Sequence, residues 1–234
     1  MLCMKEAKKS NYLGTKFLVD NLKKDRKAIM AGGYFKGFGF DGLGKDIVTK
    51  SYYDTQDFFL QMHGITINKN DYKGKAYSDL VVRYESEKKR IEFLSEFPDT
   101  FAMQIPAKSS IYQYSDFITY AIGELLPSGL GVDVASFIQN ISPVIVVNKK
   151  RDYMRSFSVN GLKMFVYFTT AEYSTPLVPK LKQKLEMIEL DSDTIDHKKE
   201  YDEFIKKLTF SNPTLIQLQH SDVLIGREYL FNVK

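Results

Sequence analysis

The stretch Ser51-Tyr-Tyr-Asp-Thr-Gln-Asp-Phe-Phe-Leu-Gln-Met-His-Gly-Ile65 organises the chain around it. The residues that lead into it, Asp46–Tyr53, alternate as in a half-buried strand. Asp54 stands where its carboxylate can cap the N-terminus of a short helix over Thr55–His63, and Gly64 is placed to end that helix. The stretch therefore predicts a strand that leads directly into a capped helix.

Short alternating or apolar runs predict strands along the rest of the chain. They are Asn11–Val19, Tyr77–Glu85, Lys88–Phe97, Val144–Lys150, Asp152–Val159, Leu162–Thr170 and Leu185–Leu190. The dipeptide Asn160-Gly161 between two of them is typical of a hairpin turn. Strands at both ends of the chain, with helices between them, predict an α+β fold whose antiparallel sheet closes into a β-barrel of about eight strands with flanking helices.

Helices are expected between and after these strands. Apolar residues recur at helical spacing over Ile111–Leu126, and a proline and a glycine end that pattern. Further helices are expected over Asp20–Met30, Val132–Ile141, Asp193–Leu208 and Ser221–Phe231. Because the chain has no internal repeat and no low-complexity linker, we expect an N-terminal tail at 1–10 and a single barrel domain at 11–234, with a helical insertion at 111–141.

A glycine-rich segment, Ala31–Gly44, holds six glycines and predicts a flexible loop. Its end, Gly39–Asp46, nearly spells a phosphate-binding P-loop. The last position of that motif needs a hydroxyl that ligates magnesium, whereas Asp46 would repel phosphate. We therefore expect a connecting loop here and not a P-loop.

The composition sets limits on the class of protein. The net charge of +4 neither requires nor excludes a polyanionic ligand. The single Cys3 cannot form an internal disulfide, which favours a reducing, cytoplasmic setting, and no apolar run is long enough to span a membrane. One cysteine and three scattered histidines give no zinc-ligand spacing. No predicted helix carries a concentrated basic face, so we do not expect duplex nucleic acid as a partner.

Charged side chains recur on one face of three predicted strands. The pairs, each two residues apart, are Arg83 with Glu85, Arg90 with Glu92, and Lys149 with Arg151. An ordinary sheet would place such charges in solvent. Three such strands in one chain are also consistent with a barrel whose interior is polar, where cations would hold phosphates and acids would hold a bridging metal.

The opening stretch resembles the signature of the CYTH, or triphosphate-tunnel, family. The matching residues are Tyr53-Asp54-Thr55, Asp57, Leu60 and Gly64. Other stretches follow in the family's order, namely Lys16–Val19, Leu80–Arg83, Val144–Arg151, Ile188–Leu190 and Gly226-Arg227. The resemblance thus covers about residues 12–230. It implies a barrel whose tunnel binds triphosphates, such as tripolyphosphate, thiamine triphosphate, RNA 5′ ends or ATP, and hydrolyses or rearranges them with magnesium or manganese.

Carried over position by position, the resemblance implies two sets of site residues. The phosphate-binding set is Lys16, Arg83, Arg90, Lys149 and Arg151, and the metal-binding set is Glu85, Glu92 and Glu189. The chain departs from the family where charged residues are expected, at Tyr12, Gly14, Asn68, Asn70, Thr169 and Met187. More phosphate-binding positions than metal-binding positions survive, which makes two-metal catalysis hard to build.

Three functions follow from this uneven loss. The first is a tunnel protein that binds a phosphorylated small molecule with catalysis weak or lost. The second is a divergent triphosphatase that uses Mg or Mn held on repositioned acids, among them Glu85, Glu92, Glu172 or Glu189. The third is an interaction module whose tunnel is closed by side chains, with the insertion as a partner surface. The identity of the ligand and the oligomeric state stay open.

Overall fold

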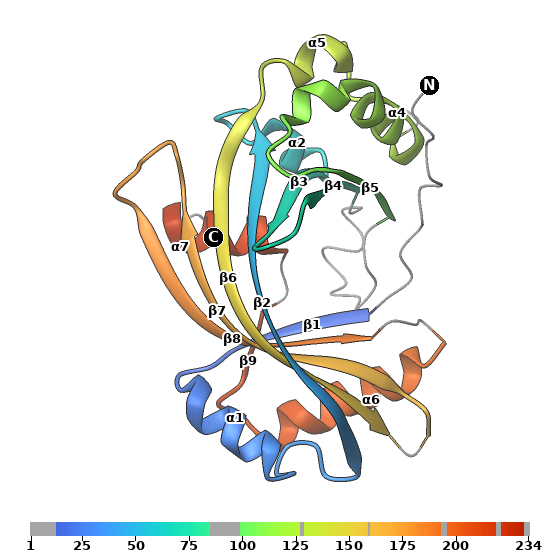
Figure 1. The fold of residues 1–234 in the computed structure, drawn as a ribbon, viewed down its shortest axis with the longest axis vertical. Coiled ribbons are helices and arrows are strands. Elements are labelled where there is room, and N and C mark those ends of the chain that lie inside the picture. The colour runs from blue at the N-terminus through green and yellow to red at the C-terminus, as the bar shows by residue number, and fades with distance from the viewer. Residues whose placement is uncertain are drawn as a thin grey trace.

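The computed structural model describes residues 13–84, 99–126, 129–158, 160–192, 196–218 and 221–231. One antiparallel sheet of nine strands dominates it, in the order β5-β4-β3-β2-β6-β7-β8-β1-β9 (Figure 1). The strands are β1 (Leu13–Leu18), β2 (Phe38–Asp54), β3 (Ile65–Tyr72), β4 (Tyr77–Tyr84), β5 (Asp99–Pro106), β6 (Ser142–Ser158), β7 (Lys163–Ser174), β8 (Lys182–Ser192) and β9 (Ile216–Leu218). The predicted α+β class is confirmed. Within the described ranges the sheet has two edges, β5 and β9, so closure into a barrel stays a prediction.

The longest strands, β2 and β6, pair along almost their whole length, from Phe38 opposite Ser158 to Asp54 opposite Ser142. The prediction of two strands, Val144–Lys150 and Asp152–Val159, is therefore wrong, because one strand covers both. The polar run between them suggested a turn, but its alternate side chains line a polar interior.

The glycine-rich segment is a loop only in its first half, because residues from Phe38 onward belong to β2. Gly42, with φ of +72°, lies at a bulge where the pairing with β6 shifts register. A Cβ at Gly44 would lie 2.1 Å from the ring of Tyr153 on β6, so that aromatic ring fills the space which glycine leaves. The predicted loop is thus wrong over Phe38–Gly44.

Three strands after Gly64 were not predicted, β3, β5 and β9. β3 carries the polar run Asn68–Asp71, which lacks the β-branched and aromatic residues that indicate a strand. β5 pairs with β4 from Tyr77 opposite Pro106 to Tyr84 opposite Asp99. The predicted strand Lys88–Phe97 lies outside the described residues.

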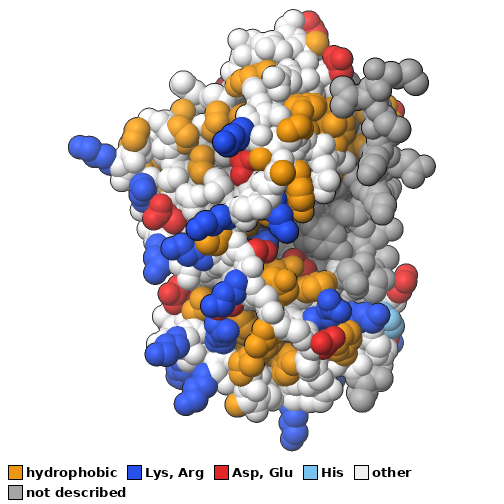
Figure 2. All heavy atoms as spheres, viewed as in Figure 1, with side chains coloured by type: hydrophobic (Ala, Val, Ile, Leu, Met, Phe, Trp, Pro, Cys, Tyr) orange, Lys and Arg blue, Asp and Glu red, His pale blue; other side chains and the backbone are white. Residues whose placement is uncertain are grey.

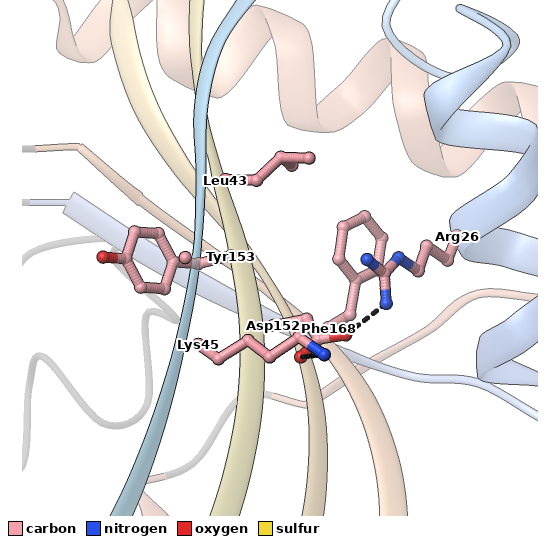
Figure 3. Close-up of a pocket in the computed structure, with 7 residues that line it drawn as sticks. Arg26, Leu43, Lys45, Asp152, Tyr153 and Phe168 are labelled. Atoms are coloured by element: carbon pink, nitrogen blue, oxygen red, sulfur yellow. Dashed lines mark hydrogen bonds and ion pairs between the residues drawn. The ribbon is translucent and has the colours of Figure 1, made fainter.

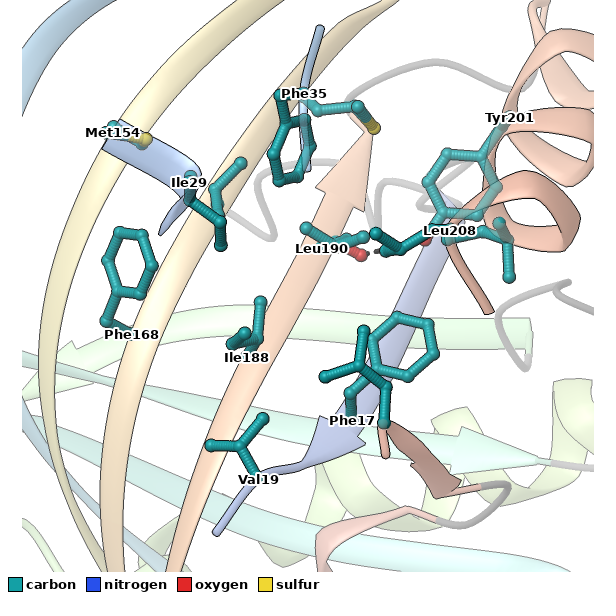
Figure 4. Packing of buried hydrophobic residues seen from close by; sticks show 14 of the residues in the cluster. Phe17, Val19, Ile29, Phe35, Met154, Phe168, Ile188, Leu190, Tyr201 and Leu208 are labelled. Atoms are coloured by element: carbon teal, nitrogen blue, oxygen red, sulfur yellow. Dashed lines mark hydrogen bonds between the residues drawn. The ribbon is translucent and has the colours of Figure 1, made fainter. Parts of the chain in front are cut away.

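Helices cover the outer face of the sheet in two groups. α1 (Leu22–Met30) and α6 (Lys198–Ser211) pack against β1 and β6 to β8, where Phe17, Phe168 and Leu190 are buried (Figures 1 and 4). The second group packs against β3 to β5 and consists of α2 (Phe59–Met62), the 3-10 helix η1 (Ile111–Tyr114), α4 (Ser115–Leu125) and α5 (Val134–Ile138). The insertion 111–141 therefore contributes to the core. The helix predicted over Thr55–His63 is shorter, because α2 begins only at Phe59 and Phe58 stands at its N-cap. Asp54 still accepts backbone N–H bonds from Leu60 and Gln61 in the first turn of α2, as well as from Thr55.

The last helix, α7 (Asp222–Phe231), lies on the opposite face of the sheet, which we call the inner face. Its residues Val223, Ile225 and Leu230 cluster with Val147 of β6, Ala171 of β7 and Met187 of β8. A Cβ at Gly226 would lie 2.8 Å from the Ile145 side chain, so glycine permits this close packing. α7 thereby carries its first residue, Asp222, into the interior.

Candidate functional site

The inner face of the sheet gathers charged side chains from five strands. The strand registers place these side chains on one face, because residues two apart along a strand, and residues paired with each other on neighbouring strands, share a face of the sheet. They are Lys16 of β1, Asp46 and Lys50 of β2, Arg83 of β4, Lys149 and Arg151 of β6, and Glu189 and Asp191 of β8. Leu80 and Val82, which alternate with Arg83, are buried on the outer face, as alternation predicted.

Three lysines converge on the carboxylate of Asp222, and we call these four residues the Asp222 cluster. The Nζ atoms of Lys16, Lys50 and Lys149 lie 2.7, 3.0 and 3.0 Å from its oxygens. Burial alone would raise the pKa of Asp222, but the three ammonium groups hold it well below its usual range. Burial lowers the pKa of Lys50 to about 8, against the opposing effect of Asp222.

A second carboxylate, Glu189, joins this cluster through Lys149. The Lys149 Nζ donates to Glu189 at 2.8 Å, and the Thr169 hydroxyl donates to the other oxygen at 2.5 Å. Burial would raise the pKa of Glu189, but Lys149 and the other lysines lower it to about 2. Burial likewise opposes the charge on Lys149, yet Asp222 and Glu189 raise its pKa above the ordinary value. All three groups are therefore ionised in the folded protein at neutral pH.

The predicted arginines Arg83 of β4 and Arg151 of β6 lie on the same face as the lysines. Arg151 donates two hydrogen bonds of 2.7 Å to Asp46 and lies over the ring of Tyr167 at 4.8 Å. Arg83 acts electrostatically on Lys50, so it lies near the same cluster. The structure thus brings Lys16, Arg83, Lys149 and Arg151 to one face, whereas Arg90 lies outside the described residues.

The predicted metal set is not assembled by the part of the chain that the structure describes. Glu85 and Glu92 fall outside it, and its His, Cys, Asp and Glu residues form no group of three that could hold a metal ion. Glu189 is engaged by Lys149 and Thr169. Glu172, a suggested replacement ligand, is exposed on the outer face beside Lys182, so that suggestion is wrong. A magnesium or manganese ion does not fit the donor set formed by these described residues.

Sequence reasoning missed Lys50, Asp191 and Asp222. Lys50 could have been found, because it alternates with Tyr52 in a predicted strand and so shares the inner face. Asp222 could not, since its contact with Lys16 joins residues 206 positions apart. No local sequence pattern shows that α7 packs on the inner face of the sheet and brings Asp222 to the lysines.

Asp191 lies two residues from Glu189 on the inner face of β8 and is partly buried. Burial, aided by the charge of Glu189, raises the pKa of Asp191 to about 6. Lys16, Lys50 and Lys149 oppose this rise without cancelling it. Asp191 thus gives up its proton less readily than Glu189 and Asp222 do.

Replacing Asp191 by asparagine is expected to stabilise the protein at pH 8 but not at pH 4. The raised pKa means that the folded state holds the proton more tightly than the unfolded chain, so stability falls as the pH rises from about 4 to 6. Asparagine does not ionise and so avoids the cost of a buried negative charge. We therefore expect the free energy of unfolding to rise by about 1–3 kcal/mol at pH 8. Urea unfolding at both pH values measures it, with Asp41→Asn, an exposed acid of β2, as control. A gain that does not depend on pH would contradict the assignment.

A separate pocket of about 130 Å³ lies between α1 and strands β2, β6 and β7. Arg26 of α1 reaches into it, forms an ion pair with Asp152 and lies over the ring of Phe168 (Figure 3). Its charged pair is mutually satisfied, and it includes none of the inner-face cations. We therefore do not place the phosphate site here.

The surface adds two observations. On the part of the face in Figure 2 that the described residues form, Lys and Arg side chains are interspersed with acidic and apolar ones. Among the described helices, none has the length and apolar character needed to cross a membrane.

Comparison with protein-family models gives no match, and none is found among curated proteins. Solved structures do match. A candidate adenylyl cyclase from Hippeastrum, described as having a dominant triphosphatase activity, aligns at a TM-score of 0.54 and 11% identity over 93% of this chain and 95% of its own. A candidate adenylate cyclase from Bacillus halodurans gives 0.51 and 12% over 86% and 91%. A protein from Pyrococcus horikoshii OT3 gives 0.50 and 13% over 92% and 99%.

Identities this low show a shared fold alone. The fold is therefore what this chain has in common with these solved structures. The activities described for these proteins are properties of those proteins and are not carried over to this chain by the shared fold.

Proposed function

We propose that the protein binds a phosphorylated small molecule, such as a nucleotide, a triphosphate or a polyphosphate, on the inner face of the sheet, with catalysis weak or lost. The observation that carries this proposal is the convergence of the cations Lys16, Lys50, Arg83, Lys149 and Arg151 on one face. A semi-enclosed group of cations attracts phosphate without a metal.

The balance of charge supports an anionic ligand. Among the residues that the structure describes, Lys16, Lys50 and Lys149 contact two carboxylates, those of Asp222 and Glu189. Burying a charge is costly unless it is paired, so three ammonium groups in contact with two carboxylates favour a further anion. The lysines come from three different strands, which holds their spacing fixed before a ligand arrives.

Two alternative functions are each supported by one specific observation. A divergent Mg- or Mn-dependent triphosphatase is supported by the fold shared with the Hippeastrum protein, but it needs carboxylates besides Glu189. A protein-interaction module is supported by the packing of α7 on the inner face, which fills part of that space with side chains.

A thermal-unfolding screen tests these functions against one another. Tripolyphosphate, ATP, GTP and thiamine triphosphate would each be added in EDTA and with Mg or Mn, with phosphate release followed in parallel. Because a ligand that prefers the folded state raises the midpoint, we expect a rise of roughly 5–10 °C at 100-fold excess over Kd, without phosphate release. Metal-dependent release would favour the triphosphatase, and no shift with any ligand would favour the interaction module.

A further inference from the structure

The carboxylate of Asp222 receives more donors than a side-chain carboxylate needs. Lys16 and Lys149 approach Oδ1 at 2.7 and 3.0 Å, and Lys50 approaches Oδ2 at 3.0 Å. The hydroxyls of Tyr173 and Tyr52 add contacts of 3.5 and 3.3 Å to the same two oxygens. Three ammonium groups and two hydroxyls thus surround a single planar group that has two oxygens.

This donor set suits a phosphoryl group better than a carboxylate. A phosphoryl group carries up to about two negative charges and three strong acceptor oxygens. The three ammonium groups of the cluster match that number of acceptors. The single charge of Asp222 cannot neutralise three lysines, even with Glu189 beside Lys149.

The position of Asp222 places it outside the strands of the sheet. It is the first residue of α7, and the helix is held from its other side by Arg227. The Arg227 guanidinium donates to Gln61 of α2 at 3.0 Å and lies over the ring of Phe58 at 5.1 Å. A shift of the first turn of α7 would remove the carboxylate and would also move Val223 and Ile225 from their packing on the inner face, while Arg227 keeps its contact with α2.

We propose that Asp222 is a built-in competitor, whose carboxylate occupies the phosphoryl subsite formed by Lys16, Lys50 and Lys149 until a phosphorylated ligand displaces it. This inference rests on the proposed function and adds a regulator to that site. The ligand class it implies has a terminal phosphoryl group small enough to enter the space that the carboxylate vacates. Binding then costs the energy of releasing Asp222, so that only a ligand of higher negative charge replaces it.

The variant Asp222→Asn tests the competitor directly. It removes the internal anion, so the ligand-free variant should unfold at a lower temperature than the wild type because three lysines lose their shared counter-charge. Its affinity for tripolyphosphate in EDTA should rise at least tenfold, because nothing has to be displaced. Asp152→Asn, which makes the same charge change at the ion pair with Arg26, should leave that affinity within twofold.

The outcomes separate this inference from the function on which it rests. If the wild type binds tripolyphosphate and Asp222→Asn binds it no more tightly, Asp222 is a structural ion-pair partner and the inference is overturned while the function stands. If neither protein binds, both are overturned.

Hydrogen exchange on the wild type covers the case in which the variant does not fold. Tripolyphosphate should speed backbone exchange in the first turn of α7, from Asp222 to Ile225, while exchange in β6 stays equal or slows. Unchanged or slower exchange in that turn would overturn displacement of the carboxylate.

Discussion

Replacing Lys149 by alanine is expected to destabilise the protein by about 3–5 kcal/mol, because removal of one partner leaves buried charges without compensation. The Lys149 side chain is fully buried and contacts both Glu189 at 2.8 Å and Asp222 at 3.0 Å. Alanine would leave Glu189 with only the Thr169 hydroxyl among its side-chain contacts described above. Urea unfolding followed by circular dichroism measures the loss.

Lys150 is the matched control for this experiment. It neighbours Lys149 on β6 but is exposed on the outer face. Lys150→Ala should change the free energy of unfolding by no more than about 0.5 kcal/mol, as is usual at exposed positions. A loss below 1 kcal/mol for Lys149→Ala would mean that the interior cluster is solvated and not the tightly paired group described here.

The double variant Lys16→Ala/Lys50→Ala is expected to weaken binding of tripolyphosphate by more than 100-fold. Each hydrogen bond to a charged group contributes about 1.5–3 kcal/mol, so losing two removes about 3–6 kcal/mol. Both side chains are partly accessible, at 21% and 18% exposure, and Asp222 keeps its contact with Lys149 when they are removed. Calorimetric titration at pH 7 in EDTA measures the change, since the pKa of Lys50 is about 8 and the residue is charged there.

Two exposed lysines of β8 provide the control for binding. Lys182 and Lys184 have side chains that are 58% and 65% exposed, and they pair with acids outside the cluster. Their double alanine variant makes the same change in net charge and should bind tripolyphosphate within about threefold of the wild type, because exposed charges are screened. Equal weakening by the two double variants would indicate general charge attraction and would remove the site from the inner face.

Alternation along strands predicted much of the site. Alternation placed Arg83 on the opposite face of its strand from Leu80 and Val82. It also placed Lys149 and Arg151 on the same face of theirs, and the structure confirms both predictions. These predictions succeeded because side chains in a strand alternate strictly, whatever covers each face. The capping role of Asp54 was predicted for a similar reason, since a cap depends on residues near it in sequence.

The failures have physical causes in a polar interior. The run Asn148–Asp152 suggested a turn because such runs usually face water, yet Lys149 and Arg151 find carboxylates inside. β3 was missed because its inner-face residues Asn68 and Asn70 are polar, whereas apolar residues at alternate positions would have indicated a strand. In the folded protein the two amides satisfy each other through a hydrogen bond of 2.8 Å. Asp222 was missed because its partners are brought to it only by the folded sheet.

The midpoint of thermal unfolding of the wild-type protein in EDTA, with and without millimolar tripolyphosphate, tests the central claim most directly. The arrangement of Lys16, Lys50, Lys149, Arg83 and Arg151 predicts a rise of several degrees without metal and without release of phosphate. An unchanged midpoint would contradict the claim that the inner face binds a phosphorylated ligand.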